Sequence, residues 1–271
     1  MIAEATVDEF ILPNEISKDV FMHLKYKYES PFWCKENLIN LAVNRLTSSN
    51  LNWQYVAWID SDITFLNTNW VQETIQELKK AHFVQLFSYL IKSGPNNEAL
   101  EVQNSYTLIN YLNTLQIPKM PFTNFAPGIS LACTRWAFEN TLGLIDFNIV
   151  GGGDNILMNL LTQRLETFLQ TRVMNLNISS TYINLLWEKQ NLYKQFNINL
   201  SFIRGAVLSH WHGKRVNRNY IKRWKILRGF DPSEDLIRNV DGLLNLSKKG
   251  KRMENELYQY FLQRDDDNLK Y

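Results

Sequence analysis

The stretch Tyr55-Val56-Ala57-Trp58-Ile59, followed by Asp60-Ser61-Asp62, decides the expected fold of this chain. Its first five residues are apolar and rich in aromatic and β-branched side chains, which predicts a strand covered on both faces in an α/β protein. Ligands of open α/β sheets bind beyond the carboxyl ends of the strands, so we expect Asp60 and Asp62 to face a ligand. Two interpretations stay open: a divalent cation completed by substrate phosphates, or an Asp-rich turn before the next helix.

Length and composition fit one large domain, or one domain with a small appendage, because 45% of the 271 residues are hydrophobic and 13% are aromatic. The net charge of only +2, from 29 basic and 27 acidic residues, gives no general attraction for nucleic acid or an anionic membrane. Cys34 and Cys133 lack a metal-type spacing, so we expect reduced thiols in a reducing compartment. No apolar run approaches the roughly 18 residues that span a bilayer, and we expect a soluble, cytoplasmic protein.

Apolar periodicity predicts alternating helices and strands over most of the chain. Besides the strand at 55–59, the expected strands are 2–12, 82–89, 129–134 and 203–211, and the expected helices are 33–47, 70–80, 135–142, 219–228, one after the glycines at 151–153 and an amphipathic tail from 248. This alternation predicts βαβ units and a largely parallel sheet. The segment 109–125, with Pro118 and Pro121, is expected to be irregular, as loops that shape substrate sites often are.

Three glycines precede Asp154, at the expected start of a helix. Consecutive glycines are entropically unfavourable, so they indicate a backbone with positive φ or one that lies against a ligand. Asp154 would then stand at the mouth of the crevice. It can serve as the helix N-cap or as a general base, and the two roles are compatible because a carboxylate has several lone pairs.

His210 and His212 lie two residues apart on an expected strand, so their side chains should share a face while Trp211 points the other way. One of them can complete a metal site, and either can be an ordinary hydrogen-bonded histidine. The chain has only 4 histidines, and these two stand beside a glycine and a basic cluster, which favours a functional role.

A basic run without acidic residues follows the histidines. We expect its first members, Lys214, Arg215 and Arg218, to bind a diphosphate, because ammonium and guanidinium groups suit phosphate oxygens. The later cations are more simply interpreted as the solvated face of a helix over 219–228. RNA binding is a weaker alternative, because the overall charge is near neutral and no aromatic repeat accompanies the cations.

The order of these motifs resembles the GT-A glycosyltransferases: Asp-x-Asp after a strand, Gly-Gly-x-Asp before a helix, and a late His-x-His-Gly with basic residues. The similarity is to inverting members such as the β-1,4-galactosyltransferases and polypeptide N-acetylgalactosaminyltransferases, and especially to phage- and bacterial-type relatives. It implies an α/β fold whose Rossmann-like mixed central sheet is flanked by helices. The implied organisation is a GT-A-like domain over 1–247 and an amphipathic C-terminal helix and tail over 248–271.

The resemblance also implies a role for each candidate residue. Asp62 would ligate Mn²⁺ or Mg²⁺ together with His212 or, less favoured, His210. Asp154 would be the base that activates the acceptor hydroxyl. The implied donor contacts are Asp60, Ser61, Lys35, Lys214, Arg215 and Arg218, and the acceptor contacts are Gly152 and Gly153, with Trp136 as a candidate for sugar stacking or else for core packing.

Two departures from the family pattern stand out. The loop reads Gly-Gly-Gly-Asp, without the family's Glu, and only about sixty residues precede the Asp pair. We therefore expect the family's first strand and helix to be absent or supplied by a partner chain. The leading hypothesis is a metal-dependent inverting glycosyltransferase of the hexosyltransferase type, which moves a sugar from a nucleotide-diphosphate donor to a glycan or other hydroxyl acceptor. The alternatives are a non-catalytic nucleotide-sugar or glycan-binding remnant and a metal-dependent phosphoesterase.

Overall fold

A four-stranded mixed sheet forms the centre of the computed structural model, which describes residues 1–6, 9–10, 12, 22–49, 51–115, 125–264 and 266. The strand order is β10 (Leu200–Phe202), β5 (Phe83–Gln85), β9 (Ser130–Thr134) and β3 (Tyr55–Ile59). β10 and β5 are parallel, whereas β9 runs antiparallel to both β5 and β3. Because both neighbours of β9 oppose it, β3 and β5 point the same way and their carboxyl ends lie at one edge of the sheet.

Helices alternate with the strands, and polar side chains explain where several of them begin. Ser105, Thr134 and Ser179 are N-caps whose side chains accept a backbone N–H of the first helical turn. The α-helices are α1 (Lys35–Ser48), α2 (Trp70–Leu78), α3 (Tyr106–Thr114), α4 (Arg135–Asn140), α5 (Gly153–Leu161), α6 (Leu165–Phe168), α7 (Ser180–Gln195), α8 (Pro232–Asp235) and α9 (Glu254–Arg264). A π-helix, η1 (Leu169–Val173), and four 3₁₀ helices complete the described set: η2 (Met174–Leu176), η3 (Arg215–Arg218), η4 (Lys222–Leu227) and η5 (Gly250–Met253).

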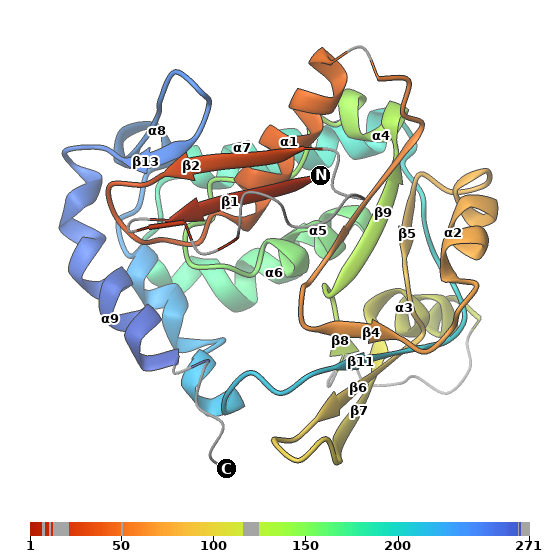
Figure 1. Cartoon of the computed structure of the whole chain (residues 1–271). Helices are drawn as coiled ribbons and strands as arrows, with labels where there is room; N and C mark the ends of the chain where they lie inside the picture. Colours follow the sequence, from red (N-terminus) through yellow and green to blue (C-terminus); the bar gives the residue numbers. More distant parts are fainter. Residues whose placement is uncertain are drawn as a thin grey trace.

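Helices cover both faces of the central sheet, because successive side chains of its strands point to opposite faces. Leu131 and Cys133 of β9 pack in the main core with residues of α1, α5 and α7, whereas Ala132 packs on the opposite face with Leu78 of α2. Figure 1 shows α2 beyond β5 and the helices α1, α5 and α7 on the other side of β9. The prediction of an α/β fold with a mixed central sheet between helices is confirmed.

A second sheet, of five strands, brings the Asp-x-Asp turn close to the segment that carries the histidines. Its order is β4 (Ile63–Phe65), β11 (Ala206–Ser209), β6 (Tyr89–Ser93), β7 (Ala99–Ser105) and β8 (Phe125–Ala126). The turn with Asp60, Ser61 and Asp62 connects β3 of the central sheet to β4 of this one. β11 is antiparallel to β4 with Ser209 opposite Ile63, so the chain after β11 lies beside the chain before β4.

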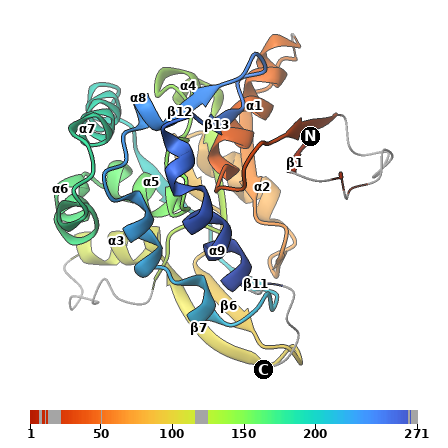
Figure 2. The same cartoon turned by 90° about the vertical axis from the view of Figure 1, so that its left-hand side faces the viewer.

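Two small sheets and the last helix complete the described structure. β1 (Ile2–Thr6) and β2 (His23–Lys27) form a parallel pair, and β12 (Leu236–Arg238) and β13 (Leu244–Leu246) form a hairpin. Helix α9 buries Leu257 in the main core and packs against η3 and η4, and Figure 2 shows it running alongside the segment that carries them.

The structure corrects several expected elements. The central sheet is not largely parallel, because β9 opposes both of its neighbours. β3 is not covered on both faces: Val56 and Trp58 pack on the main core, but Ala57 is exposed and Ile59 is 40% exposed. In the described part of the chain β3 pairs with β9 alone, so it is an edge strand. On its second face only Tyr55, at the start of the strand, packs against the cluster that contains Leu78 of α2.

The observed bounds of several other helices and strands also differ from the expected ones. The run expected as one strand over 82–89 is divided between β5 in one sheet and β6 in the other. The segment 109–125 is not wholly irregular, because α3 continues to Thr114; its part 116–124 lies outside the described residues. The strand expected over 203–211 is β11 and ends at Ser209, and the basic helix expected over 219–228 is the 3₁₀ helix η4.

Two remaining expectations concern the thiols and the membrane. Cys34 and Cys133 are both free, as predicted. Among the described residues, the structure contains no helix that combines the length and the apolar character needed to cross a bilayer.

Candidate active site

Three predicted site residues from distant parts of the chain meet at the carboxyl edge of β3. Lys35 is the first residue of α1, Asp60 follows β3, and Asp154 is the second residue of α5. The Lys35 Nζ lies 2.6 Å from Asp60 Oδ1 and 3.6 Å from Asp154 Oδ2. The ammonium group therefore bridges the two carboxylates and draws together the Asp pair and the glycine loop.

Burial and charge act in opposite directions within this cluster. Burial alone would lower the pKa of Lys35, but the negative charges of Asp154, Asp60 and Glu36 outweigh it and raise that pKa. Burial raises the pKa of Asp60; Lys35 opposes this shift, and the charge of Asp154 adds to it. Lys35 is therefore charged in the folded protein and available to compensate negative charge at this edge of the sheet.

Asp62 and His212 form a second polar pair. The His212 Nδ1 lies 2.6 Å from Asp62 Oδ2 and 2.7 Å from the carbonyl oxygen of His210. Two acceptors at Nδ1 favour the tautomer that donates there. For both side chains to bind one metal ion, this hydrogen bond must be replaced by coordination. A carboxylate and an imidazole together suit Mn²⁺ better than Mg²⁺, whose usual ligands are oxygens. No group of three or more His, Cys, Asp or Glu side chains placed to hold a metal occurs in the described part of the chain.

His210 does not join that pair, which corrects the expectation that both histidines share a face. β11 ends at Ser209, so the two-residue strand repeat does not continue through the histidines. The backbone N–H of His210 donates to the Asp62 carbonyl at 2.8 Å, and its ring Nε2 lies 2.9 Å from the Thr64 hydroxyl. His210 thus orders the backbone beside Asp62 while its ring faces β4.

The basic residues after the histidines separate from one another. An Arg218 guanidinium nitrogen donates to the His212 carbonyl at 2.9 Å and to Asp266 at 3.0 Å, so Arg218 holds the loop that carries His212. Arg215 forms an ion pair with Glu101 on β7, and Lys214 has an exposed side chain, as does Ser61 in the turn after β3. The structure therefore brings Arg218 close to the Asp62–His212 pair and directs Arg215 toward the β6–β7 hairpin.

The glycine loop takes the positive φ angles that the sequence predicts at two of its three positions. Gly151 has φ 78° and Gly152 has φ 90°, and Gly152 is the N-cap of α5. A Cβ at Gly151 would press on Trp33 and on Arg223, a largely buried arginine. The N-cap interpretation of Asp154 is wrong, because the cap is Gly152 and no side chain caps α5. The Asp154 carboxylate is therefore free of the helix end and faces Lys35.

The sequence interpretation missed Glu36 and Gly128. Glu36 is 6% exposed, and Trp33 Nε1 donates to its Oε2 at 3.1 Å. A Cβ at Gly153 would collide with Glu36 Oε1, and a Cβ at Gly128 would collide with Asp154 Oδ2. A side chain at either position would displace a carboxylate, because the carboxylate occupies the space of its Cβ. The only sequence signal for Glu36 is its place next to Lys35, and Gly128 gives none.

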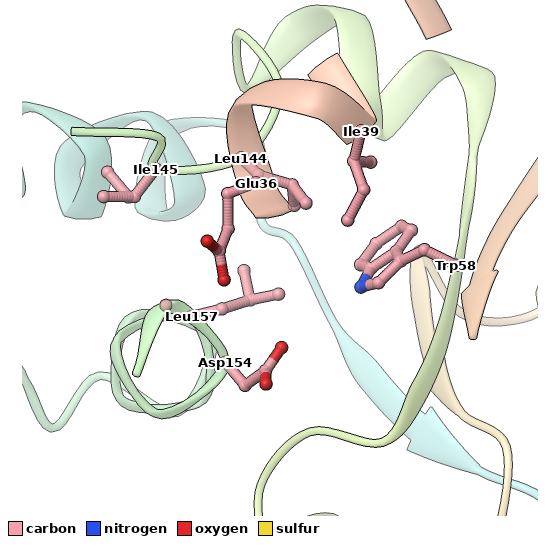
Figure 3. A pocket seen from close by; sticks show the side chains of 8 residues that line it. Glu36, Ile39, Trp58, Leu144, Ile145, Asp154 and Leu157 are labelled. Carbon is pink, nitrogen blue, oxygen red and sulfur yellow. The ribbon is translucent and has the colours of Figure 1, made fainter. Parts of the chain in front are cut away.

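Glu36 and Asp154 line a cavity of about 10 Å³, which is the size of a single water molecule. Figure 3 shows both carboxyl groups and the indole nitrogen of Trp58 directed toward the same space. The remaining walls are apolar and consist of Ile39, Leu144, Ile145 and Leu157, with Gly153. Burial, and then the charge of Asp154, raise the pKa of Glu36 to about 7.

Trp136 lies at the other end of the sheet. It follows Thr134, which pairs with Tyr55 at the start of β3, whereas Asp60 follows the end of β3. Its ring contacts His82 and Phe196, with centroids 5.1 Å and 5.7 Å away. The structure therefore does not place Trp136 with Gly152 and Gly153, and we withdraw it as an acceptor contact.

Glu36→Gln is expected to change how stability depends on pH. The pKa of Glu36 is raised on folding, so its contribution is complete below the unfolded value near 4.5 and is lost as the pH rises through about 7. Relative to the variant, the wild type should lose on the order of 3 kcal/mol of unfolding free energy across this range. Urea unfolding at several pH values measures it. Parallel curves for the two proteins would show that burial of Glu36 leaves its titration unchanged.

Comparison of the chain with family models, with curated proteins and with solved structures found no match. The assignment of a function therefore depends on the geometry described above.

Proposed function

We propose that this protein is a metal-dependent inverting glycosyltransferase of the GT-A type, which transfers a sugar from a nucleotide-diphosphate donor to a hydroxyl acceptor. The observation that carries the proposal is the convergence of three sequence motifs at one edge of the sheet. Asp62 lies 2.6 Å from His212, while Lys35 joins Asp60 to Asp154. A metal-binding pair and a separate carboxylate base side by side are what such a transfer requires.

Each part of the cluster has a chemical task in the proposed reaction. Asp62 and His212 would hold Mn²⁺, which when bound supplies positive charge to the donor diphosphate. Lys35 adds a half-buried ammonium that compensates charge on the leaving group. Asp60 orients that ammonium and is placed to contact the donor. Asp154 accepts the proton of the acceptor hydroxyl while the oxygen attacks the anomeric carbon and the diphosphate departs with the electrons of the broken bond.

The first experiment measures Mn²⁺-dependent release of nucleoside diphosphate. The full chain is incubated with a panel of nucleotide-diphosphate sugars and hydroxyl acceptors, with Mn²⁺, with Mg²⁺ or with a chelator. We expect release and transfer with Mn²⁺ for at least one donor and none with the chelator. If no nucleotide sugar is bound or consumed under any of these conditions, the proposal is wrong.

One observation favours a second candidate, a nucleotide-sugar-binding protein without turnover. Lys35 engages both Asp60 and Asp154, so neither carboxylate is without an ionic partner. In an enzyme, by contrast, these contacts would rearrange when substrate binds. Calorimetry distinguishes the two candidates: Mn²⁺-dependent binding of a nucleotide sugar, without product in a broad acceptor screen, identifies the binding protein.

Gly128→Ala is expected to lower kcat by about ten- to a hundredfold with little change in stability. The new Cβ would occupy the place of Asp154 Oδ2, so the carboxylate must move, while Gly128 has no positive φ that a side chain would strain. Steady-state kinetics and thermal unfolding measure the two effects. Gly94→Ala is the matched control, because it presses on the carboxylate of Glu98 in a surface turn. Equal kcat values for both variants and the wild type would show that the position of Asp154 does not matter.

A further inference from the structure

We propose that Glu36 is a positioning residue of the site, which shares a proton with Asp154 and sets the pH range in which Asp154 accepts the proton of the acceptor. The inference rests on the proposed function and extends it, because no sequence motif assigns Glu36 a role. It depends on three features of the described structure: a fixed carboxyl group, a cavity common to both acids, and an excess of negative charge around it.

The Glu36 carboxyl group is fixed from two sides. Trp33 Nε1 donates to Oε2 at 3.1 Å, and Oε1 lies against the backbone of Gly153, where no side chain would fit. Gly153 directly precedes Asp154, so the second acid is held against the peptide that carries the first. A glycine at 153 thus admits a carboxyl group from α1 into the start of α5.

The cavity gives the two acids a common polar space. Its volume of about 10 Å³ accommodates one water molecule. Figure 3 shows the Glu36 and Asp154 carboxyl groups and the Trp58 indole nitrogen around this space, with apolar side chains behind them. A water there would have two carboxyl groups and one N–H as partners, which is the number that a buried water usually has. A proton can therefore be shared between the acids through such a water.

Charge in this region is unbalanced toward the negative side. The cation near these acids is Lys35, which is acted on by the negative charges of Asp154, Asp60 and Glu36. Two arginines lie close to the glycine loop and to Trp33, but Lys35, and neither arginine, is the cation that opposes the raised pKa of Glu36. Arg223 donates to the Tyr260 hydroxyl, and Arg264 lies over the Trp33 ring and pairs with Asp266. Neighbouring carboxyl groups that cannot all ionise retain a proton, and the most buried one is the natural site for it.

The consequence for the proposed reaction follows from the titration of Glu36. Because its pKa is about 7, the Glu36 carboxyl group changes its ionisation state near neutral pH. Below this value Glu36 is neutral. Above it, an ionised Glu36 adds a negative charge beside Asp154 and attracts the proton that leaves the acceptor hydroxyl, so the transfer step is favoured.

The decisive experiment compares the pH dependence of kcat in the wild type and in Glu36→Gln. We expect kcat of the wild type to rise about three- to tenfold between about pH 6 and about pH 8, and the rise to disappear in the variant with KM little changed. Glu139→Gln is the matched control: it makes the same change on α4, where Glu139 pairs with Arg135. A Glu36→Gln variant that keeps the wild-type profile overturns the inference.

A second measurement does not need turnover. The infrared difference spectrum between wild type and Glu36→Gln should show a carboxylic-acid C=O band at about pH 6 that is lost at about pH 8. In Asp154→Asn the same band should be lost at lower pH, because the neighbouring charge is gone. If no such band is found, or if it titrates at the same pH in the wild type and in Asp154→Asn, then Glu36 shares no proton with Asp154. If the band behaves as expected but no donor is consumed, the proposed function fails and the shared proton remains.

Gly153→Ala provides a variant that keeps both acids. Its new Cβ would occupy the place of Glu36 Oε1 and push the carboxyl group away from Asp154. We expect the carboxylic-acid band to shift its titration toward the ordinary range of a glutamate. An unchanged titration in a folded Gly153→Ala protein contradicts the shared proton.

Discussion

Asp154→Asn is expected to lower kcat by about 10²- to 10⁴-fold while binding of the nucleotide donor is retained. The amide has the shape of the carboxylate but cannot accept the proton of the acceptor hydroxyl. The fold should survive, because no side chain caps α5 and because Lys35 keeps Asp60 as a partner at 2.6 Å. Single-turnover kinetics separate the chemical step from donor binding, which calorimetry measures independently.

Asp241→Asn is the matched control for this substitution. Asp241 is exposed in the turn between β12 and β13, so the same chemical change there should leave kcat unaltered. Normal turnover by Asp154→Asn would remove Asp154 from the role of base and leave the glycine loop with a structural task only.

Asp62→Ala is expected to weaken Mn²⁺ binding by about a hundredfold or more and to abolish Mn²⁺-dependent turnover. The substitution removes the carboxylate beside His212, and with it the hydrogen-bond acceptor at 2.6 Å that orients the imidazole. Electron paramagnetic resonance of free Mn²⁺, titrated with protein, measures the affinity directly. His212→Ala should give a loss of similar size.

His210→Gln distinguishes the two histidines. Its ring faces Thr64 and not Asp62, so the glutamine variant should bind Mn²⁺ within a few-fold of the wild type. Should His210→Gln lose the metal while His212→Ala keeps it, the assignment of ligands must be exchanged. Equal Mn²⁺ affinity in Asp62→Ala and wild type would refute the metal site itself.

Local patterns predicted much of the fold. The helix expected over 33–47 is α1, that over 70–80 is α2, and the apolar run at 55–59 is β3. In these segments the apolar residues recur with a clear period and the ends are well marked. Both features depend on residues close in sequence. The fate of the run 82–89 depends on distant partners: β5 pairs with β9 and β10, whereas β6 pairs with β7 and β11. No pattern within eight residues distinguishes one sheet from the other.

In the candidate site, too, local sequence features predicted some residues correctly, whereas the places of others depend on distant parts of the chain. The end of a strand marks Asp60 and the start of a helix marks Asp154, whereas only the family resemblance implies Lys35. The structure brings the three within ion-pair distance. His210 and His212 were expected to share a face, but the strand stops before them and the chain turns. Trp136 was a candidate because of its chemistry alone, and its place at the far end of β9 depends on the antiparallel direction of that strand.

Side-chain alternation and local backbone sterics were enough to predict the α/β class, the position of Asp60 and Asp62 at the end of a strand, and positive φ as one of two explanations for the glycines at 151–153. The antiparallel direction of β9, the place of Lys35 between two acids and the entry of Glu36 into the space at Gly153 emerge only in the folded molecule. These contacts join residues far apart in the chain, and their geometry is set by how the core packs.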